Sequence, residues 1–68
     1  MDFQKGDKIK IIEMQGEPQY TGKIGIIDHI DDIGQLHGTW GGCAVIPEAD
    51  KIEVLEKAVN YENTTQRD

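Results

Sequence analysis

The chain has 68 residues and a formal net charge of −6, with seven Lys and Arg against thirteen Asp and Glu. A chain of this length folds as one small domain and buries only about 60% of its unfolded surface, which leaves no room for a two-lobed enzyme. Its apolar runs are far shorter than the ~20 residues of a membrane-spanning helix. Its acidic balance disfavours general nucleic-acid binding, for which a basic face is usual.

The single cysteine, Cys43, bears on the cellular compartment. One cysteine cannot form an internal disulfide, whereas small secreted domains usually depend on several. The N-terminus, MDFQKGDK, lacks the apolar stretch of a secretory signal peptide. We therefore expect a cytoplasmic protein in which Cys43 is reduced and packed.

The apolar residues favour a sheet, because ten isoleucines and three valines stand against two leucines. Residues 7–14 alternate polar and apolar side chains and predict a half-buried strand. Residues 15–22 contain two glycines and a proline and predict an irregular loop. Residues 23–30 predict a second strand, whose alternation breaks and so indicates a bulge near residues 25–28.

Residues 31–34, with the sequence DDIG, predict the turn of a hairpin. A three-residue hairpin loop combines a type I turn with a left-handed residue at its last position, and that position favours glycine, here Gly34. The side chain of Asp31, at the first turn position, is expected to accept hydrogen bonds from backbone amides further along. The turn therefore predicts a specific strand register.

This register places His29 opposite His37 on the outer face, with Cβ atoms about 5 Å apart. It also places Ile30 opposite Leu36, both facing inward. Two histidines at this separation could bind zinc or copper, but a metal needs a third and usually a fourth ligand. Asp31 and Gln35, on the same face, are weak candidates, and Cys43 is expected on the opposite face. We predict a cross-strand surface pair with no metal and no cofactor.

The remaining elements follow at short intervals. We predict a third strand at 35–40, a two-residue hairpin loop at 41–42 and a fourth strand at 43–46. A helical turn at 47–50 and a fifth strand at 51–55 complete the predicted elements. The Gly-Gly pair is typical of primed hairpin turns, and proline suits the first position of a helical turn. With this loop, Trp40 pairs with Cys43, both facing inward. Gly38 either leaves space for the indole or lets another backbone come close.

Five short strands in about 50 residues predict an all-β fold. We expect a small five-stranded SH3-like barrel, with a short helical turn before the last strand, because closure removes exposed sheet edges. The barrel would span residues 1–55. Residues 56–68 lose periodicity and predict a flexible polar tail, disordered or with a short helix.

The pattern GDKIKII…G.IG.I..IDDIGQLH..W…VIPE.D.IEV resembles the domain of unknown function 4314 family over roughly residues 6 to 55. The most specific part is IDDIGQLHGTW, an acidic turn and a glycine followed by a strand that ends in tryptophan. The resemblance implies a small β-barrel and an origin in phages and mobile elements of bacteria. No activity or catalytic residue is established for this family, so the resemblance implies none here.

These observations predict a non-enzymatic binding or accessory module, because a filled barrel offers no concave, water-excluding site. The expected partner is a protein, without involvement of a membrane, and the chain is expected to be a monomer or a weak homo-oligomer. The candidate partner-binding residues are Tyr20, His29, His37 and Trp40. The alternative is nucleic-acid binding by an SH3-like barrel of the KOW type, through a local patch of Lys5, Lys8, Lys10 and Lys23.

Overall fold

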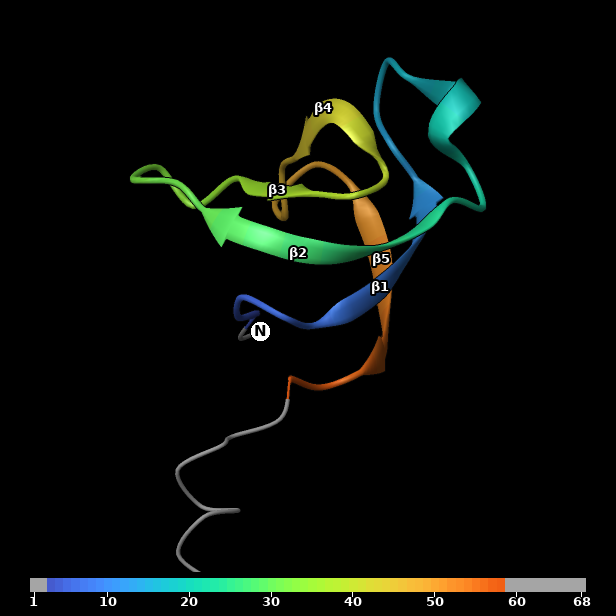
Figure 1. Ribbon diagram of the computed structural model, residues 1–68. Helices are drawn as coiled ribbons and strands as arrows, with labels where there is room; N and C mark the ends of the chain where they lie inside the picture. Colours follow the sequence, from blue (N-terminus) through green and yellow to red (C-terminus); the bar gives the residue numbers. More distant parts are fainter. Residues whose placement is uncertain (1–2, 59–68) are drawn as a thin grey trace, which may run out of the picture.

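The computed structural model describes residues 3–58, which form an all-β domain. Five antiparallel strands make one sheet in the order β4-β3-β2-β1-β5 (Figure 1). The strands and the single 3₁₀ turn are β1 (Lys8–Glu13), η1 (Pro18–Tyr20), β2 (Ile24–Ile30), β3 (Leu36–Gly38), β4 (Gly41–Val45) and β5 (Lys51–Glu56). Within this part of the chain, the edge strands β4 and β5 do not pair with each other, so the sheet is open. No helix among these residues is long and apolar enough to cross a membrane.

The long strand β2 is shared between two ladders. Its first half, from Ile24 to Ile26, pairs with β1, and its second half, from Ile27 to Ile30, pairs with β3. The register shifts after Ile27, which confirms the predicted bulge. A bulge bends a strand and increases its twist, and it lets β2 turn from one half of the sheet into the other. Figure 1 shows β5 running across the direction of β2.

The core lies on the inner face of the sheet. β1 alternates as predicted, with Ile9 and Ile11 fully buried and Lys8 and Lys10 turned outward. The buried apolar side chains are Ile9, Ile11, Met14, Ile27, Leu36, Trp40 and Val45. Phe3 and Ile52 are only partly buried and pack against this core. The interior is therefore small, as the length of the chain predicted.

The predicted loop at 41–42 is wrong. Gly38 pairs with Gly41, so the loop residues are Thr39 and Trp40, and both glycines of the Gly-Gly pair belong to β4. Trp40 therefore does not pair with Cys43, although its Nε1 donates a hydrogen bond to the Cys43 carbonyl oxygen at 2.8 Å. The predicted core position of Trp40 is confirmed, since the residue is 5% exposed.

Burial of the indole explains why the turn lies at Thr39–Trp40. An indole buries roughly 150–250 Å², worth roughly 4–6 kcal/mol as an upper bound at 25 cal/mol per Å². A difference in turn preference is smaller than this. The ring needs the space of two glycines, because a Cβ on Gly25 would lie 3.1 Å from Trp40 Cε3 and one on Gly38 2.7 Å from Cη2. Gly38 thus leaves space for the indole and also lets the backbone of Ile26 come close, because the Ile26 carbonyl oxygen is the atom nearest to an added Cβ.

Residues 47–50 form a single hydrogen-bonded helical turn, as predicted. The backbone amides of Ala49 and Asp50 donate to the Ile46 carbonyl oxygen at 2.9 and 2.8 Å. β5 begins directly afterwards and extends to Glu56, one residue past the predicted end of the barrel. The predicted tail beyond residue 58 lies outside the described residues.

Candidate binding site

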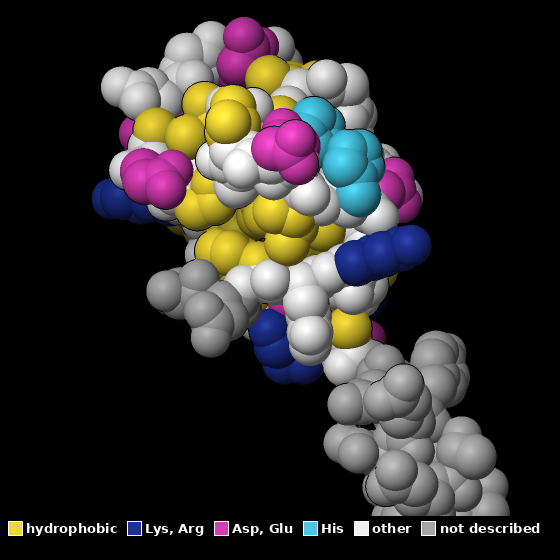
Figure 2. Space-filling model, turned by 90° about the vertical axis from the view of Figure 1, so that its left-hand side faces the viewer, with side chains coloured by type: hydrophobic (Ala, Val, Ile, Leu, Met, Phe, Trp, Pro, Cys, Tyr) yellow, Lys and Arg dark blue, Asp and Glu magenta, His cyan; other side chains and the backbone are white. Residues whose placement is uncertain are grey.

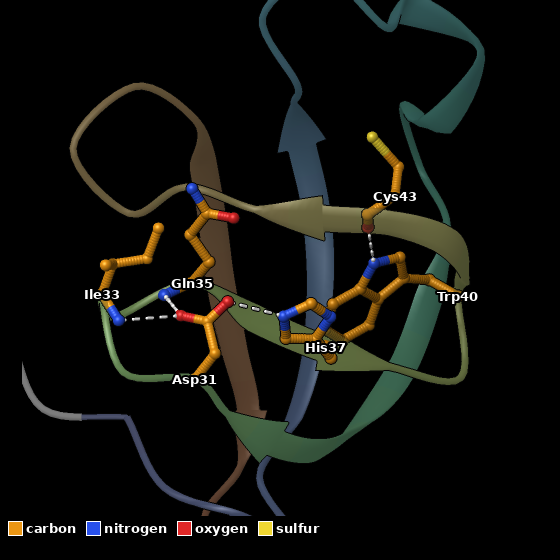
Figure 3. A network of polar contacts seen from close by, with 6 residues as sticks. All are labelled: Asp31, Ile33, Gln35, His37, Trp40 and Cys43. Carbon is orange, nitrogen blue, oxygen red and sulfur yellow. Dashed lines mark hydrogen bonds and ion pairs between the residues drawn. The ribbon is translucent and has the colours of Figure 1, made fainter.

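The β2–β3 hairpin has the predicted turn. Gly34 has a φ of +85°, the left-handed conformation that favours glycine. The Gly34 amide donates to the Asp31 carbonyl oxygen, and the Asp31 amide donates to the Gln35 carbonyl oxygen, both at 3.0 Å. Asp31 Oδ1 accepts hydrogen bonds from the amides of Ile33 and Gln35 at 3.1 and 2.9 Å (Figure 3). The carboxylate therefore holds the turn closed from within.

The histidine pair forms as predicted. His29 and His37 stand opposite each other across the two strands, with parallel rings whose centroids are 4.4 Å apart. His37 Nε2 and Asp31 Oδ2 are 2.8 Å apart, and the proton of this bond belongs to His37 because a carboxylate only accepts. This hydrogen bond, together with those from the Gln35 and Ile33 amides, holds the pKa of Asp31 below its ordinary value of 3.8.

This stacked geometry does not suit a metal centre. The lone pairs of an imidazole lie in the ring plane, and the two planes are only 2° from parallel, so the ring nitrogens do not converge on one ion. Asp31, the nearest carboxylate, is already bonded to His37 and to two amides. Among residues 3–58, no three His, Cys, Asp or Glu side chains gather as metal ligands. The pair acts here as a flat, polar surface feature.

The two aromatic candidates lie elsewhere and do not join the histidines. Tyr20, at the end of η1, packs over Gly41, where an added Cβ would lie 2.9 Å from Tyr20 Cε1. Its ring lies 5.9 Å from the Nζ of Lys23 and is partly buried. Trp40 is in the core and offers no exposed face to a partner. In Figure 1 the η1 segment and the tip of the β2–β3 hairpin lie at opposite sides of the molecule.

The four candidate lysines do not make a continuous basic surface. Lys8 and Lys10 lie on the outer face of β1, with exposed Ile26 and Ile24 opposite them on β2. On the other side, Glu56 and Glu53 of β5 stand opposite the same two lysines. Lys5 and Lys23 are exposed but lie outside the strands. Acidic and apolar side chains therefore interrupt the patch, and this weakens the nucleic-acid alternative.

Three exposed isoleucines lie on the β2–β3 hairpin and directly after β4; we call Ile30, Ile33 and Ile46 the open end. Their exposed fractions are 38%, 75% and 39%. The predicted Ile30–Leu36 pair forms, but only Leu36 is buried, because Ile30 is the last residue of β2. Figure 2 looks onto this end and shows apolar side chains across the middle of the face, with the histidines at one side.

A shallow pocket of about 320 Å³ lies beside the residue that follows Ile46. Its walls come from the N-terminal segment, from the turn before β5 and from β5 itself, and are Phe3, Pro47, Glu48, Asp50 and Ile52. No sequence pattern predicts this pocket, because its walls come from segments far apart in the chain. An isoleucine in a solvent-exposed turn, at position 33, was the available signal for the open end.

Two buried aspartates join segments that are far apart in the sequence, and no local sequence pattern predicts either role. Asp50 accepts hydrogen bonds from the amides of Gln15 and Ile46, each at 2.8 Å. Asp7, fully buried, accepts from Lys57 Nζ at 2.9 Å and from the Ala58 amide at 2.7 Å, and also from the Gln4 amide. Burial of Asp7 raises its pKa, but these hydrogen bonds outweigh that effect and hold the pKa below 3.8.

Comparison with known proteins gives a family without an activity. The model of a family described as a domain of unknown function (DUF4314) matches residues 1–55. The match covers the β2–β3 hairpin and every residue that lines the pocket. No curated protein and no solved structure matches the chain.

Proposed function

The chain belongs to the domain of unknown function 4314 family, and on that premise we propose that it is a small non-enzymatic module that binds a protein partner through its open end. The proposal includes an SH3-like barrel fold, a cytoplasmic location and an origin in a phage or mobile element. The strand order, the sharing of β2 between two ladders and the single turn before β5 support the barrel as the finer description of the sheet.

The observation that carries the binding proposal is the exposure of the open end. Ile30, Leu36 and Val45 form one row across three strands, and Ile46 follows directly. The row is buried at Leu36 and Val45 and exposed at Ile30. Figure 2 shows apolar side chains across the middle of this face. Exposed apolar surface of this kind on a small domain favours an interaction site, since leaving it in water costs about 25 cal/mol per Å² relative to burial.

Ile33 adds to this argument because its position has no need of an apolar side chain. It lies in a turn that the Asp31 carboxylate and Gly34 already hold closed. A polar residue would serve the turn equally well. Because Ile33 is 75% exposed, its side chain contributes little to the stability of the fold. A contact with another molecule would explain the apolar side chain at this position.

The test is a capture experiment with the tagged full-length chain in nuclease-treated bacterial lysate. A protein retained by the wild type should be lost with Ile33→Ser and kept with Ile24→Ser. Ile24 is a matched control, because it is 50% exposed but lies on the outer face of β2, opposite Lys10. If material were captured only from a parallel lysate without nuclease, the proposal would be contradicted. Loss of the captured protein with Ile24→Ser alone would contradict it as well.

A further inference from the structure

We infer that the open end binds a cationic segment of its protein partner, with an apolar side chain of that segment in the pocket and a Lys or Arg beside Glu48. This inference rests on the proposed function and names the chemistry of the partner. It follows from the walls of the pocket, from the exposed carboxylate of Glu48 in one of these walls, from the exposed carboxylates of the β2–β3 hairpin, and from the occupants that this negative charge disfavours.

The pocket has both polar and apolar walls, and the apolar walls suit an apolar side chain of a partner. Its volume of about 320 Å³ lies at the lower limit of ligand pockets, about 300–1,000 Å³, so it accommodates a side chain or two. Phe3, Pro47 and Ile52 form apolar walls, and Phe3 and Ile52 are backed by the core. Both oxygens of Asp50 are already occupied by the amides of Gln15 and Ile46. The polar group in the wall therefore needs nothing from a ligand.

Glu48 is different, because its side chain is exposed and has no ion pair or hydrogen bond within residues 3–58. Asp28 and Asp32, on the bulge and the turn of the hairpin, are likewise exposed and have no ion pair in this part of the chain. Figure 2 shows acidic side chains in the upper half of the face and lysines at its sides and below. A carboxylate beside apolar pocket walls complements a cation beside an apolar anchor.

Charge also separates this partner from the other occupants. A second copy of the chain would bring the same net charge of −6 and, at a two-fold interface, the same carboxylates against their counterparts. Nucleic acid would bring phosphates of the same sign as Glu48 and Asp32. A cationic segment with an apolar anchor is repelled in neither of these ways. The negative charge of the chain would also attract such a segment to the site.

The test is a titration of the full-length, ¹⁵N-labelled chain with three short blocked peptides, followed by NMR. The first peptide carries Leu-Trp flanked by lysines, the second has glutamates in place of the lysines, and the third has serines in place of Leu-Trp. Only the first should shift amide resonances, and the shifts should centre on Ile46, Glu48 and Ile52. Added salt should weaken its binding.

Two variants test whether Glu48, in the wall of the pocket, contributes to binding of the lysine peptide. Glu48→Gln should weaken binding of the lysine peptide by about 1.5- to 5-fold, the range expected for one exposed ion pair. Glu53→Gln, on the outer side of β5 opposite Lys10, should leave the affinity unchanged. Equal binding of the glutamate peptide, shifts centred on Ile24 and Lys10, or no binding by any peptide would overturn the inference. A partner still captured through Ile33 would leave the proposed function standing in each of these cases.

Discussion

The two hairpins that share β3 are closed by different means. In the turn at 31–34, every hydrogen bond starts and ends within the hairpin, and Ile33, which is 75% exposed, contributes little buried surface. In the turn at Thr39–Trp40, the contacts reach into β2. Thr39 donates its amide to the Ile26 carbonyl oxygen at 3.0 Å, and its Oγ1 accepts the Ile26 amide at 2.9 Å.

This difference separates a part of the molecule that is free to change from one that is not. The first turn is local, so its exposed positions can be altered for a partner without disturbing the core. The second turn is part of the core, because the indole of Trp40 lies over Gly25 and Gly38. We therefore expect substitutions in the first hairpin to affect binding and substitutions in the second to affect folding.

The largest effect is expected from Gly38→Ala. The added Cβ would overlap the Ile26 carbonyl oxygen and the indole of Trp40. The oxygen cannot move without losing its hydrogen bond from the Thr39 amide, and the indole cannot move without leaving its place in the core. We expect loss of the cooperative unfolding transition in thermal and urea denaturation. Gly42→Ala is the matched control, because an added Cβ there meets no atom within 4 Å. Similar stability of both variants would show that the second turn is not packed as described.

Trp40→Ala should come next, with a loss of about 3–5 kcal/mol in the free energy of unfolding, as for other large-to-small core substitutions. Urea denaturation of the two turn variants, Trp40→Ala and Ile33→Ser, compares the hairpins directly. Ile33→Ser should change stability by no more than about 0.5 kcal/mol, as at other surface positions. A large loss in Ile33→Ser would mean that the first turn also supports the core.

Two aspartates extend the comparison to acid. Asp7 and Asp31 both have a folded-state pKa below the ordinary 3.8, so each contributes stability above pH 3.8 that is lost as the pH falls towards the lower folded-state pKa. Asp7 joins the two ends of the fold and is buried, whereas Asp31 acts within one exposed hairpin. Acid unfolding monitored by circular dichroism should therefore be altered more by Asp7→Asn than by Asp31→Asn.

Gly34→Ala tests the local turn alone. No atom lies within 4 Å of an added Cβ, so the cost is the left-handed backbone, about 1–2 kcal/mol. Gly34→Asn should cost less, because asparagine tolerates this conformation better. Thermal denaturation of the two variants measures the difference. Equal losses would indicate that backbone conformation does not set the stability of this turn.

The smallest effect is expected at the histidine pair. His37→Ala removes a stacked surface ring and should change the free energy of unfolding by at most about 0.5 kcal/mol. Equimolar zinc should leave the melting temperature of the wild type unchanged, since the parallel rings do not converge on an ion. A rise in melting temperature with zinc that His37→Ala abolished would show that the rings reorient to bind metal.

Features that depend on interactions between residues close in the sequence were predictable, and features that depend on distant residues were not. The β2–β3 register, the left-handed Gly34 and the facing histidines were predicted residue by residue, because the bonds that set them lie within seven residues of the chain. The bulge in β2 was visible as a break in alternation. The open end was only partly predictable, since Ile30 was expected in the core.

The contacts made by Asp7 and Asp50 left no local pattern. The Asp7 carboxylate meets the Ala58 amide 51 residues away, and Asp50 meets the Gln15 amide 35 residues away. The pocket walls likewise come together only when the N-terminal segment meets the turn before β5. The spacing of residues in the sequence does not predict contacts between segments this far apart in the chain.

The sequence by itself determined an all-β fold, the alternation of β1 and the hairpin from His29 to His37, because side-chain periodicity and turn chemistry act between near neighbours. The tertiary structure decided where the next turn lies. The Gly41-Gly42 pair has a strong local preference for a two-residue hairpin loop. A loop at Thr39–Trp40 instead places the indole against Gly25 and Gly38. Burial of that ring is a contact between three strands, and its free energy outweighs the preference of two glycines.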